Sequence, residues 1–307
     1  MLNVYKFHLH FRVTRQFELP HFQGTALRNL LSGFKERQPA LNAFFFETKL
    51  PHRQNTYSPY TLLPLRAGRA VYRRGDTFSF ELTVLGKYIE IFDNVLQMMC
   101  LRGFSNLPNC LEIQAVENII SETERKPIVD FAEAVPYIVN SEQRIVNSDL
   151  LKINFVTPVC IKNNHRADDF TFDKLINTAV HRANAIIELF AKPCGFSEPA
   201  GFYNAQALSA LAKQVEITEN NLKPFFVRHF TKNIVYRSFV GSVTYTGDFE
   251  PFITLLQLTE LIHLGKETTS GMGKIKIGRK GEREKGRTGE QEKGRTGERR
   301  MGIEKYE

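Results

Sequence analysis

The segment LGKETTSGMGKIKIG, residues 264–278, combines residue types that can bind an anion. Glycine costs backbone entropy, so a cluster of glycines predicts a backbone that turns sharply or lies close to another group. Lysines and hydroxyls occupy the same turn, and successive backbone N–H groups of such a turn can bind phosphate. The residues that we expect to face the anion are Gly265, Lys266, Ser270, Gly271, Gly273 and Lys274.

Two common phosphate-binding loops do not fit this segment. A P-loop requires G-x-x-x-x-G-K-[ST] after a strand, whereas Lys274 is followed by Ile275 and Thr268 stands at the first glycine position. A dinucleotide loop opens a helix, whereas this one follows a helix and opens a strand. Two interpretations remain: a helix cap with a glycine-rich turn, or a backbone wall that contacts the phosphates of a single strand or hairpin.

The elements that must position this loop follow the same order in both halves of the chain. Hydrophobic periodicity predicts strand–helix–strand–strand–helix–strand twice, which is the ferredoxin-like plan. We therefore expect an α+β protein with two tandem ferredoxin-like (RRM-like) domains, residues 1–130 and 150–278, joined by a linker. In the first half the predicted strands are 4–13, 77–86 and 110–120 and the helices 24–37 and 87–103. In the second half the strands are 150–162, 225–237, 239–248 and 273–278 and the helices 170–192 and 249–265.

Composition indicates a globular protein with a polyanionic partner. The 307 residues carry a net charge of +8, which favours nucleic acid first and acidic membrane surfaces second. No apolar run approaches the length of a membrane span, and the N-terminus lacks the regions of a signal peptide. The four cysteines are too widely spaced for a structural zinc site or a disulfide framework. We expect a cytoplasmic location.

The last stretch, residues 279–307, differs from the rest of the chain. It contains EKGRTGE twice and consists mainly of charged residues, glycine and threonine. Such a segment has almost nothing to bury, so the sequence predicts a disordered charged tail.

The run GSVTYTGD, residues 241–248, is followed by a predicted helix and then by the glycine loop. This combination resembles the C-terminal signature of the CRISPR-associated protein six family, the repeat-cleaving endoribonucleases of the RAMP superfamily. LPHFQGTALRNLLSGF resembles its first helix, and AFFFETKLP, SPYTLLPL and RRGDTFSFELTVLG resemble the extended segments that follow. FVTPVCIK resembles the opening of its second domain. The resemblance covers about residues 1–278.

The resemblance implies that the chain binds CRISPR repeat RNA and cleaves it without a metal. A ribose 2′-hydroxyl attacks the adjacent phosphate and leaves a 2′,3′-cyclic phosphate and a 5′-hydroxyl. The chemistry requires a base, an acid and a cation for the phosphorane. No carboxylate or cysteine cluster for a catalytic metal stands out in the sequence, so we expect neither metal nor cofactor.

The catalytic histidine is the point at which the sequence departs from this resemblance, because Phe46 stands where some relatives have a histidine. His52 is the nearest substitute, and Lys49, Arg53 and Tyr57 flank it with cations and a hydroxyl. An exposed, solvated loop is the alternative for this segment. His21, just before the first helix, is the second candidate acid–base group, the alternative being a residue that fixes the helix entry.

Other basic residues are candidates for RNA contacts. Arg28 in the first helix could steady the scissile phosphate, or could be a solvated helix arginine. The candidates for gripping the RNA backbone are Lys49, Arg69, Arg73 and Arg74. His181 and His263 lie in helical patterns among apolar residues, where buried or half-buried structural roles are expected. His8 and His10 share one side of the first strand, which could be a surface that faces RNA.

Two functions from different classes therefore stay open. One is an endoribonuclease that processes CRISPR transcripts into crRNA. The other is a catalytically inactive RAMP-superfamily subunit that only holds crRNA in an effector complex with other CRISPR subunits. A DNA-binding or membrane-surface protein is supported by charge alone.

Overall fold

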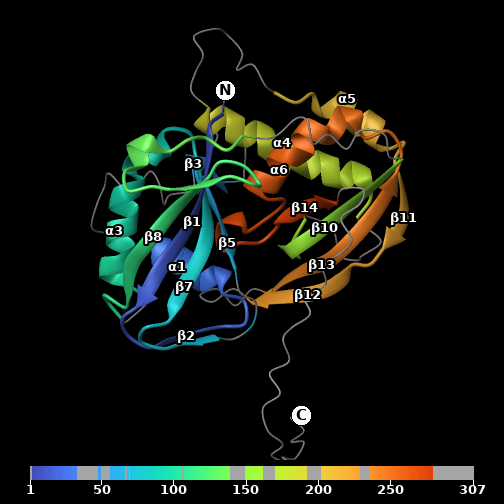
Figure 1. Ribbon diagram of the computed structural model, residues 1–307. Helices are drawn as coiled ribbons and strands as arrows, with labels where there is room; N and C mark the ends of the chain where they lie inside the picture. Colours follow the sequence, from blue (N-terminus) through green and yellow to red (C-terminus); the bar gives the residue numbers. More distant parts are fainter. Residues whose placement is uncertain are drawn as a thin grey trace, which may run out of the picture.

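Two β-sheets, each backed by helices, form the structure, which is a computed structural model (Figure 1). The structure describes residues 2–32, 48–49, 56–65, 68, 70–104, 107–138, 149–161, 170–191, 202–228 and 235–278. The predicted tail, residues 279–307, lies outside the described residues. None of the helices in these ranges is long and apolar enough to cross a membrane.

The first domain has the expected ferredoxin-like order. Its antiparallel sheet runs β5-β7-β1-β8-β9, so the first strand is flanked by the third and the fourth strands of the motif. Two helices, α1 and α3, connect the strands. The bounds are β1 Val4–Val13, α1 Gly24–Ser32, β5 Tyr60–Pro64, β7 Thr77–Leu85, α3 Phe92–Arg102, β8 Leu111–Ile119 and β9 Arg125–Pro127.

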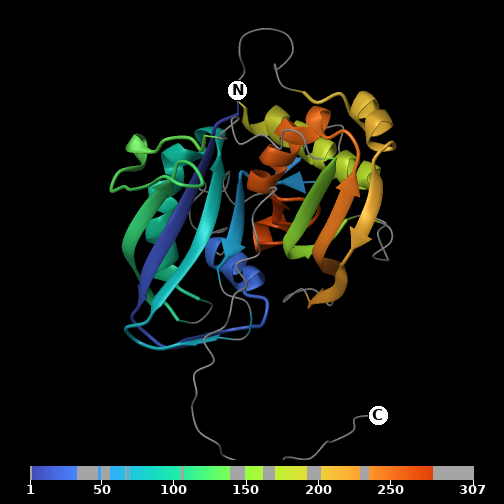
Figure 2. The same ribbon diagram turned by 45° about the vertical axis from the view of Figure 1, so that its right-hand side comes forward.

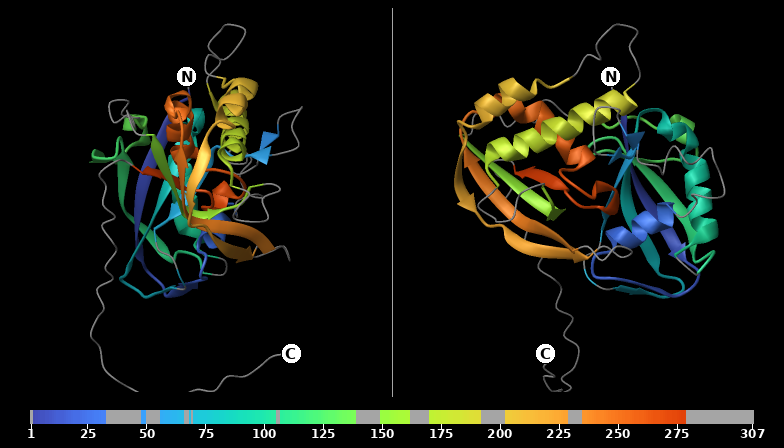
Figure 3. Two further views of the ribbon diagram at one scale, coloured as in Figure 1. Left: turned by 90° about the vertical axis from the view of Figure 1, so that its right-hand side faces the viewer. Right: turned by 180° about the vertical axis from the view of Figure 1, so that it is seen from behind.

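Strand β1 shows why this sheet has one covered and one open face. Phe7, Leu9 and Phe11 are buried and pack with residues of α1 and α3 in one core. His8 and His10 alternate with them, so they lie on the opposite face. Figure 1 looks onto that open face, with α1 behind the sheet, and the view from behind in Figure 3 brings α1 to the front.

The second domain repeats the plan with additions. Its sheet runs β11-β13-β10-β14, with β12 also paired to β13. Helices α4 and α6 cover one face, and α5 packs against α4. The bounds are β10 Leu150–Val159, α4 Phe172–Phe190, α5 Ala205–Ala212, β11 Glu216–Asn220, β12 Lys223–Arg228, β13 Val235–Thr246, α6 Ile253–Ile262 and β14 Ile275–Gly278.

The structure confirms the two ferredoxin-like domains and corrects some element bounds. The predicted strand 225–237 belongs to two strands, because β12 ends at Arg228 and β13 begins at Val235. The predicted helix 249–265 is shorter, because a 3-10 turn, η5 (Glu250–Phe252), precedes α6 and His263 has a positive φ of 62°. Periodicity did not predict α5 or the short pairs β2 (Phe17–Leu19) with β6 (Ala70–Tyr72) and β3 (Thr48–Lys49) with β4 (Thr56–Tyr57).

The two domains lie side by side and share apolar contacts. Val4, Tyr57 and Leu85 of the first domain belong to the core cluster of the second. The contact continues where α1 and β5 meet the 3-10 turn η6 (Thr268–Ser270) of the glycine-rich segment. Figure 2 shows the two sheets standing next to each other, with β14 and the segment before it between them. The predicted loop therefore lies at the domain junction.

Candidate RNA-cleaving site at the domain junction

The glycine-rich segment touches the first domain through its backbone. A Cβ atom on Gly24, at the start of α1, would lie 1.7 Å from the carbonyl oxygen of Ser270. A Cβ atom on Gly271, whose φ is 77°, would lie 2.6 Å from Cδ of Pro64 in β5. No side chain fits at either position, so glycine is required for this close approach. The glycines thus have a packing role inside the protein, as the helix-cap and turn interpretation proposes.

Glu267 is the centre of a hydrogen-bonded cluster that joins the two domains. Its Oε2 accepts from Nη1 of Arg28 in α1 at 2.9 Å and from Oγ of Ser270 at 3.2 Å. Its Oε1 accepts from the hydroxyl of Tyr236 in β13 at 3.0 Å. The side chains of Arg28 and Glu267 are only 25% and 19% exposed. The ion pair is therefore partly shielded from water, and it fixes the guanidinium of α1 against the loop.

The pKa of Tyr236 is shifted by this environment. Burial and the neighbouring carboxylate of Glu267 raise the pKa of Tyr236 to about 12. The phenol consequently keeps its proton at neutral pH and acts as a hydrogen-bond donor.

Arg182 of α4 supports the loop from within the second domain. Its Nε donates to the carbonyl oxygens of Ile262 and His263, each at 2.9 Å, and its Nη2 donates to Oγ1 of Thr268 at 2.8 Å. A cation on the last carbonyls of α6 is favourable because they carry the negative end of the helix dipole. Burial lowers the pKa of Arg182 to about 10, so the guanidinium remains charged at neutral pH. Arg182 therefore fixes the position from which the loop leaves α6.

The two histidines with expected structural roles differ in burial. His263 is buried, and burial holds its pKa well below the usual histidine value. His181 is exposed on α4, so the expectation of burial is wrong for this residue, because the helix turns that position outward.

His21 lies at the same junction, at the entry to α1. Its exposed ring stacks on Phe225 of β12 with centroids 6.2 Å apart and planes inclined by 21°. Phe225 and Tyr236 pack with Phe22 and Met272 in a small apolar cluster. His21 and the Arg28–Glu267 pair therefore border one cluster of side chains contributed by both domains.

The two lysines of the loop are placed differently. Lys266 is exposed, so its ammonium is available to an anion. Lys274 is half-buried, and its Nζ donates to the backbone carbonyl of Glu260. Burial, and then the charge of Lys6, lower the pKa of Lys274 to about 8. Lys274 lines a cleft of about 400 Å³ between the domains, together with Lys6, Glu81, Glu260 and Lys276.

The remaining predicted residues lie in separate places. Tyr57 is buried in the core cluster of the second domain. It lies close enough to Arg182 to offset part of the effect of burial on the pKa of that arginine. Arg73 and Arg74 are exposed in the turn between β6 and β7. Lys49 is in β3, which pairs with β4. The three other residues lie outside the described residues: His52, Arg53 and Arg69. Phe46 lies outside them too.

Three residues of the junction were not predicted from the sequence: Glu267, Tyr236 and Arg182. Glu267 stands inside the glycine-rich segment, where the lysines and glycines alone were sufficient to suggest an anion site. Tyr236 lies 31 residues upstream on another strand, and only the fold brings it to the loop. The signal that could have identified Glu267 is that it is the acidic residue within an otherwise basic loop.

Comparisons with known proteins agree with this architecture. A family model described as CRISPR-associated endoribonuclease Cas6 matches residues 153–275, and a model described as an N-terminal domain matches residues 2–144. No curated protein gives a significant match.

Solved structures share the fold at low sequence identity. A chain of a partial Cas6-RT-Cas1–Cas2 complex is 14% identical with a TM-score of 0.60, over 92% of this chain and 47% of that one. The present chain thus spans about half the length of that relative. Thermus thermophilus Cas6 is 16% identical with a TM-score of 0.53, over 90% of this chain and 99% of that one. A Cas6 product complex is 16% identical with a TM-score of 0.54, over 89% and 98%.

The chain is a two-domain α+β protein with the fold of these solved structures. Its two ferredoxin-like domains lie side by side, with the glycine-rich loop between them. The family model matches the second of these domains: residues 153–275 are similar to CRISPR-associated endoribonuclease Cas6.

Proposed function

We propose that this chain binds CRISPR repeat RNA and cleaves precursor transcripts into crRNA at the domain junction. The observation that carries the proposal is the contact of α1 with the glycine-rich segment, where the Arg28 guanidinium is held 2.9 Å from Glu267 beside the cluster that includes His21. A held cation and a titratable ring are two of the three groups that phosphodiester cleavage by a 2′-hydroxyl requires.

The proposed reaction is an in-line transesterification. A base removes the proton of the 2′-hydroxyl, and the 2′-oxygen forms a bond to the adjacent phosphorus. The bond from phosphorus to the 5′-oxygen breaks, and an acid protonates the leaving oxygen. The products are a 2′,3′-cyclic phosphate and a 5′-hydroxyl, so neither an oxidant nor a metal is required by the atom balance.

The side chains have distinct proposed roles. Arg28 stabilises the charge that develops on the phosphorane, because a preorganised cation contributes most where water is partly excluded. His52 is the proposed acid–base group and His21 the second candidate, with Arg53 and Tyr57 as supporting groups. Lys266 is proposed to meet a phosphate of the repeat, with Lys49, Arg69, Arg73 and Arg74 as further backbone contacts.

The proposed partners are the repeat RNA and, after cleavage, other CRISPR subunits that receive the product. Support comes from the match to the Cas6 family and from the fold shared with a Cas6 product complex. The solved Cas6-RT-Cas1–Cas2 complex also contains a chain with this fold.

The experiment is a cleavage assay on candidate repeat RNAs with EDTA present. The proposal predicts one cut in the repeat and a product end that resists 3′-end ligation until the cyclic phosphate is opened and the resulting phosphate is removed. A repeat with a single 2′-deoxynucleotide at the cut should bind with the same affinity and stay intact. Tight binding of every repeat without a cut would instead identify an inactive crRNA-holding subunit, and cleavage only with added magnesium would refute the mechanism.

A further inference from the structure

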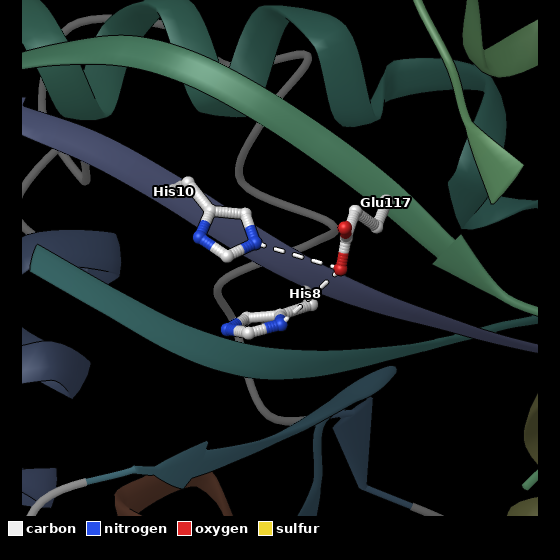
Figure 4. A group of neighbouring side chains, drawn as sticks. All are labelled: His8, His10 and Glu117. Atoms are coloured by element: carbon white, nitrogen blue, oxygen red, sulfur yellow. Dashed lines mark ion pairs between the residues drawn. The ribbon is translucent and has the colours of Figure 1, made fainter. Parts of the chain in front are cut away.

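A second group of chemically capable side chains lies on the open face of the first sheet, outside the junction. Nδ1 of His8 is 3.4 Å from Oε2 of Glu117, and Nε2 of His10 is 3.5 Å from the same oxygen. Figure 4 shows both rings directed toward this carboxylate. Within the described part of the chain, this is the one group of three such side chains whose ligand atoms all lie within 4.8 Å of one another.

The positions follow from strand register. His8 of β1 stands directly opposite Glu117 of β8, and His10 lies two residues along the same face of β1. The two rings are 3.9 Å apart between centroids. Paired strands in the middle of a sheet hold their side chains more precisely than loops do. The cluster is therefore built by the fold rather than by a mobile segment.

The distances suit a small divalent ion. Zinc binds nitrogen and oxygen ligands at about 2.0–2.1 Å, so two ligands of one tetrahedron are separated by about 3.3–3.4 Å. The distances from Nδ1 of His8 and from Nε2 of His10 to Oε2 of Glu117 are 3.4 and 3.5 Å, which is close to this ligand-to-ligand separation. The ligand nitrogens of His8 and His10 lie within 4.8 Å of each other.

The electrostatics also favour a cation at this place. Nε2 of His8 is buried and has no hydrogen-bond partner within the described residues. A lone pair on Nδ1 would repel the carboxylate unless a positive group lay between them. Arg125 now supplies that charge, with Nη1 3.4 Å from Nδ1 of His8 and 3.7 Å from Oε2 of Glu117.

Glu81 of β7, which stands opposite His8 on the other side of β1, is paired with Lys6 at 2.7 Å and is therefore not available to the ion. The side chain of Arg125 is 49% exposed, so it can move into solvent when a metal ion takes its place. Three protein ligands then leave a fourth position for water, as in open zinc sites.

We propose that His8, His10 and Glu117 form a binding site for one divalent transition-metal ion, of which zinc is the probe. The site links β1 to β8 on the face opposite to α1. It is separate from the proposed cleavage chemistry.

The test is calorimetric titration of the EDTA-stripped, tag-free full-length chain with zinc chloride. We expect one zinc ion per chain at this site. His10→Gln and Glu117→Gln should each weaken it by more than about 100-fold, beyond the loss of about 10- to 100-fold expected for an outer-shell change. His181→Gln, an exposed histidine on α4, is the matched control and should bind like the wild type. Arg125→Gln should bind at least as tightly, because a competing cation is gone.

A second measurement distinguishes loss of the metal site from misfolding of the variant. Cobalt(II) should give the visible absorption of a tetrahedral site in the wild type and in His181→Gln, and lose it in Glu117→Gln. Glu117 is a third exposed, so the metal-free variant should keep the melting temperature of the metal-free wild type. Absence of zinc binding by the wild type, or equal affinity in the wild type, His10→Gln and Glu117→Gln, would overturn the proposal.

Discussion

Arg28 in the first domain and Glu267 in the second form an ion pair of 2.9 Å across the domain junction. The same carboxylate also accepts hydrogen bonds from Ser270 and Tyr236. One side chain thus ties the first helix, the glycine-rich segment and β13 together. A group that holds the junction in this way should affect both stability and the chemistry proposed there.

Glu267→Ala should lower the free energy of unfolding by about 1–3 kcal/mol, because partly buried donors lose their carboxylate. Glu267→Gln, which keeps an acceptor oxygen, should cost less. Urea unfolding measures both. The matched control is Glu112→Ala, since the Arg12–Glu112 pair is 56% and 55% exposed and an exposed pair contributes only about 0–1 kcal/mol. Equal losses for Glu267→Ala and Glu112→Ala would contradict a special role for Glu267.

Gly24→Ala should destabilise the protein although alanine favours helices over glycine by about 1 kcal/mol. The added Cβ would lie 1.7 Å from the carbonyl oxygen of Ser270, so backbone must move. We expect a loss of at least about 1–3 kcal/mol, typical of overpacking. Thermal unfolding followed by circular dichroism measures this loss. A raised melting temperature would show that helix propensity dominates and that the junction is loose.

Lys266→Ala should weaken binding of repeat RNA and reduce the slope of log affinity against log salt by about 1, because one phosphate contact is removed. Since Lys266 is exposed, the melting temperature should stay unchanged. Fluorescence anisotropy in a salt series measures the slope. Lys213→Ala, an exposed lysine that follows α5, is the control and should leave the slope as it is. Identical slopes for both variants would remove Lys266 from the RNA interface.

Lys274 should make stability depend on pH in the alkaline range. Its pKa is about 8 in the folded protein against 10.5 as the ordinary value, so between these pH values the unfolded chain binds a proton that the folded chain does not. Its contribution to the free energy of unfolding therefore rises with pH across that window. Lys274→Met removes the titrating group, so the difference in free energy between the wild type and this variant should rise from pH 8 to 10.5. A difference curve without slope over that range would mean that the lysine titrates normally.

His52→Ala should slow the chemical step by about 10²- to 10⁴-fold, the range for loss of one general acid–base group. Single-turnover cleavage at saturating protein measures this step separately from binding. His21→Ala is the paired variant, and a small effect of this change on the cleavage rate supports His52 as the acid–base group. A wild-type rate for His52→Ala together with slow cleavage by His21→Ala would assign the acid–base role to His21. Arg28→Ala and Arg53→Ala should each cost less than the acid–base variant if several cations share the charge.

Local sequence patterns were sufficient to predict the fold class and the position of the glycine-rich loop between a helix and a strand. Alternation in residues 4–13 and helical spacing in 170–192 are local signals, because one face of each element has to be apolar whatever its partner is. The order of these elements was sufficient for two ferredoxin-like domains. The boundaries around 225–237 failed because the segment joins two strands of similar composition, and hydrophobicity does not mark where one ends.

Which side chains contact one another depends on how the elements pack. Glu267 and Tyr236 are ordinary residues in the sequence and become partners because β13 and the loop are brought against α1. The same holds for Glu117, which stands opposite His8 because antiparallel register fixes that pair. The sequence predicts the glycines of the loop as anion contacts, and the structure adds that they are required for packing, since Cβ atoms there would overlap other atoms of the protein itself. Patterns along a chain report the burial of single elements, whereas contacts between distant residues depend on how elements pack, and no local pattern encodes that.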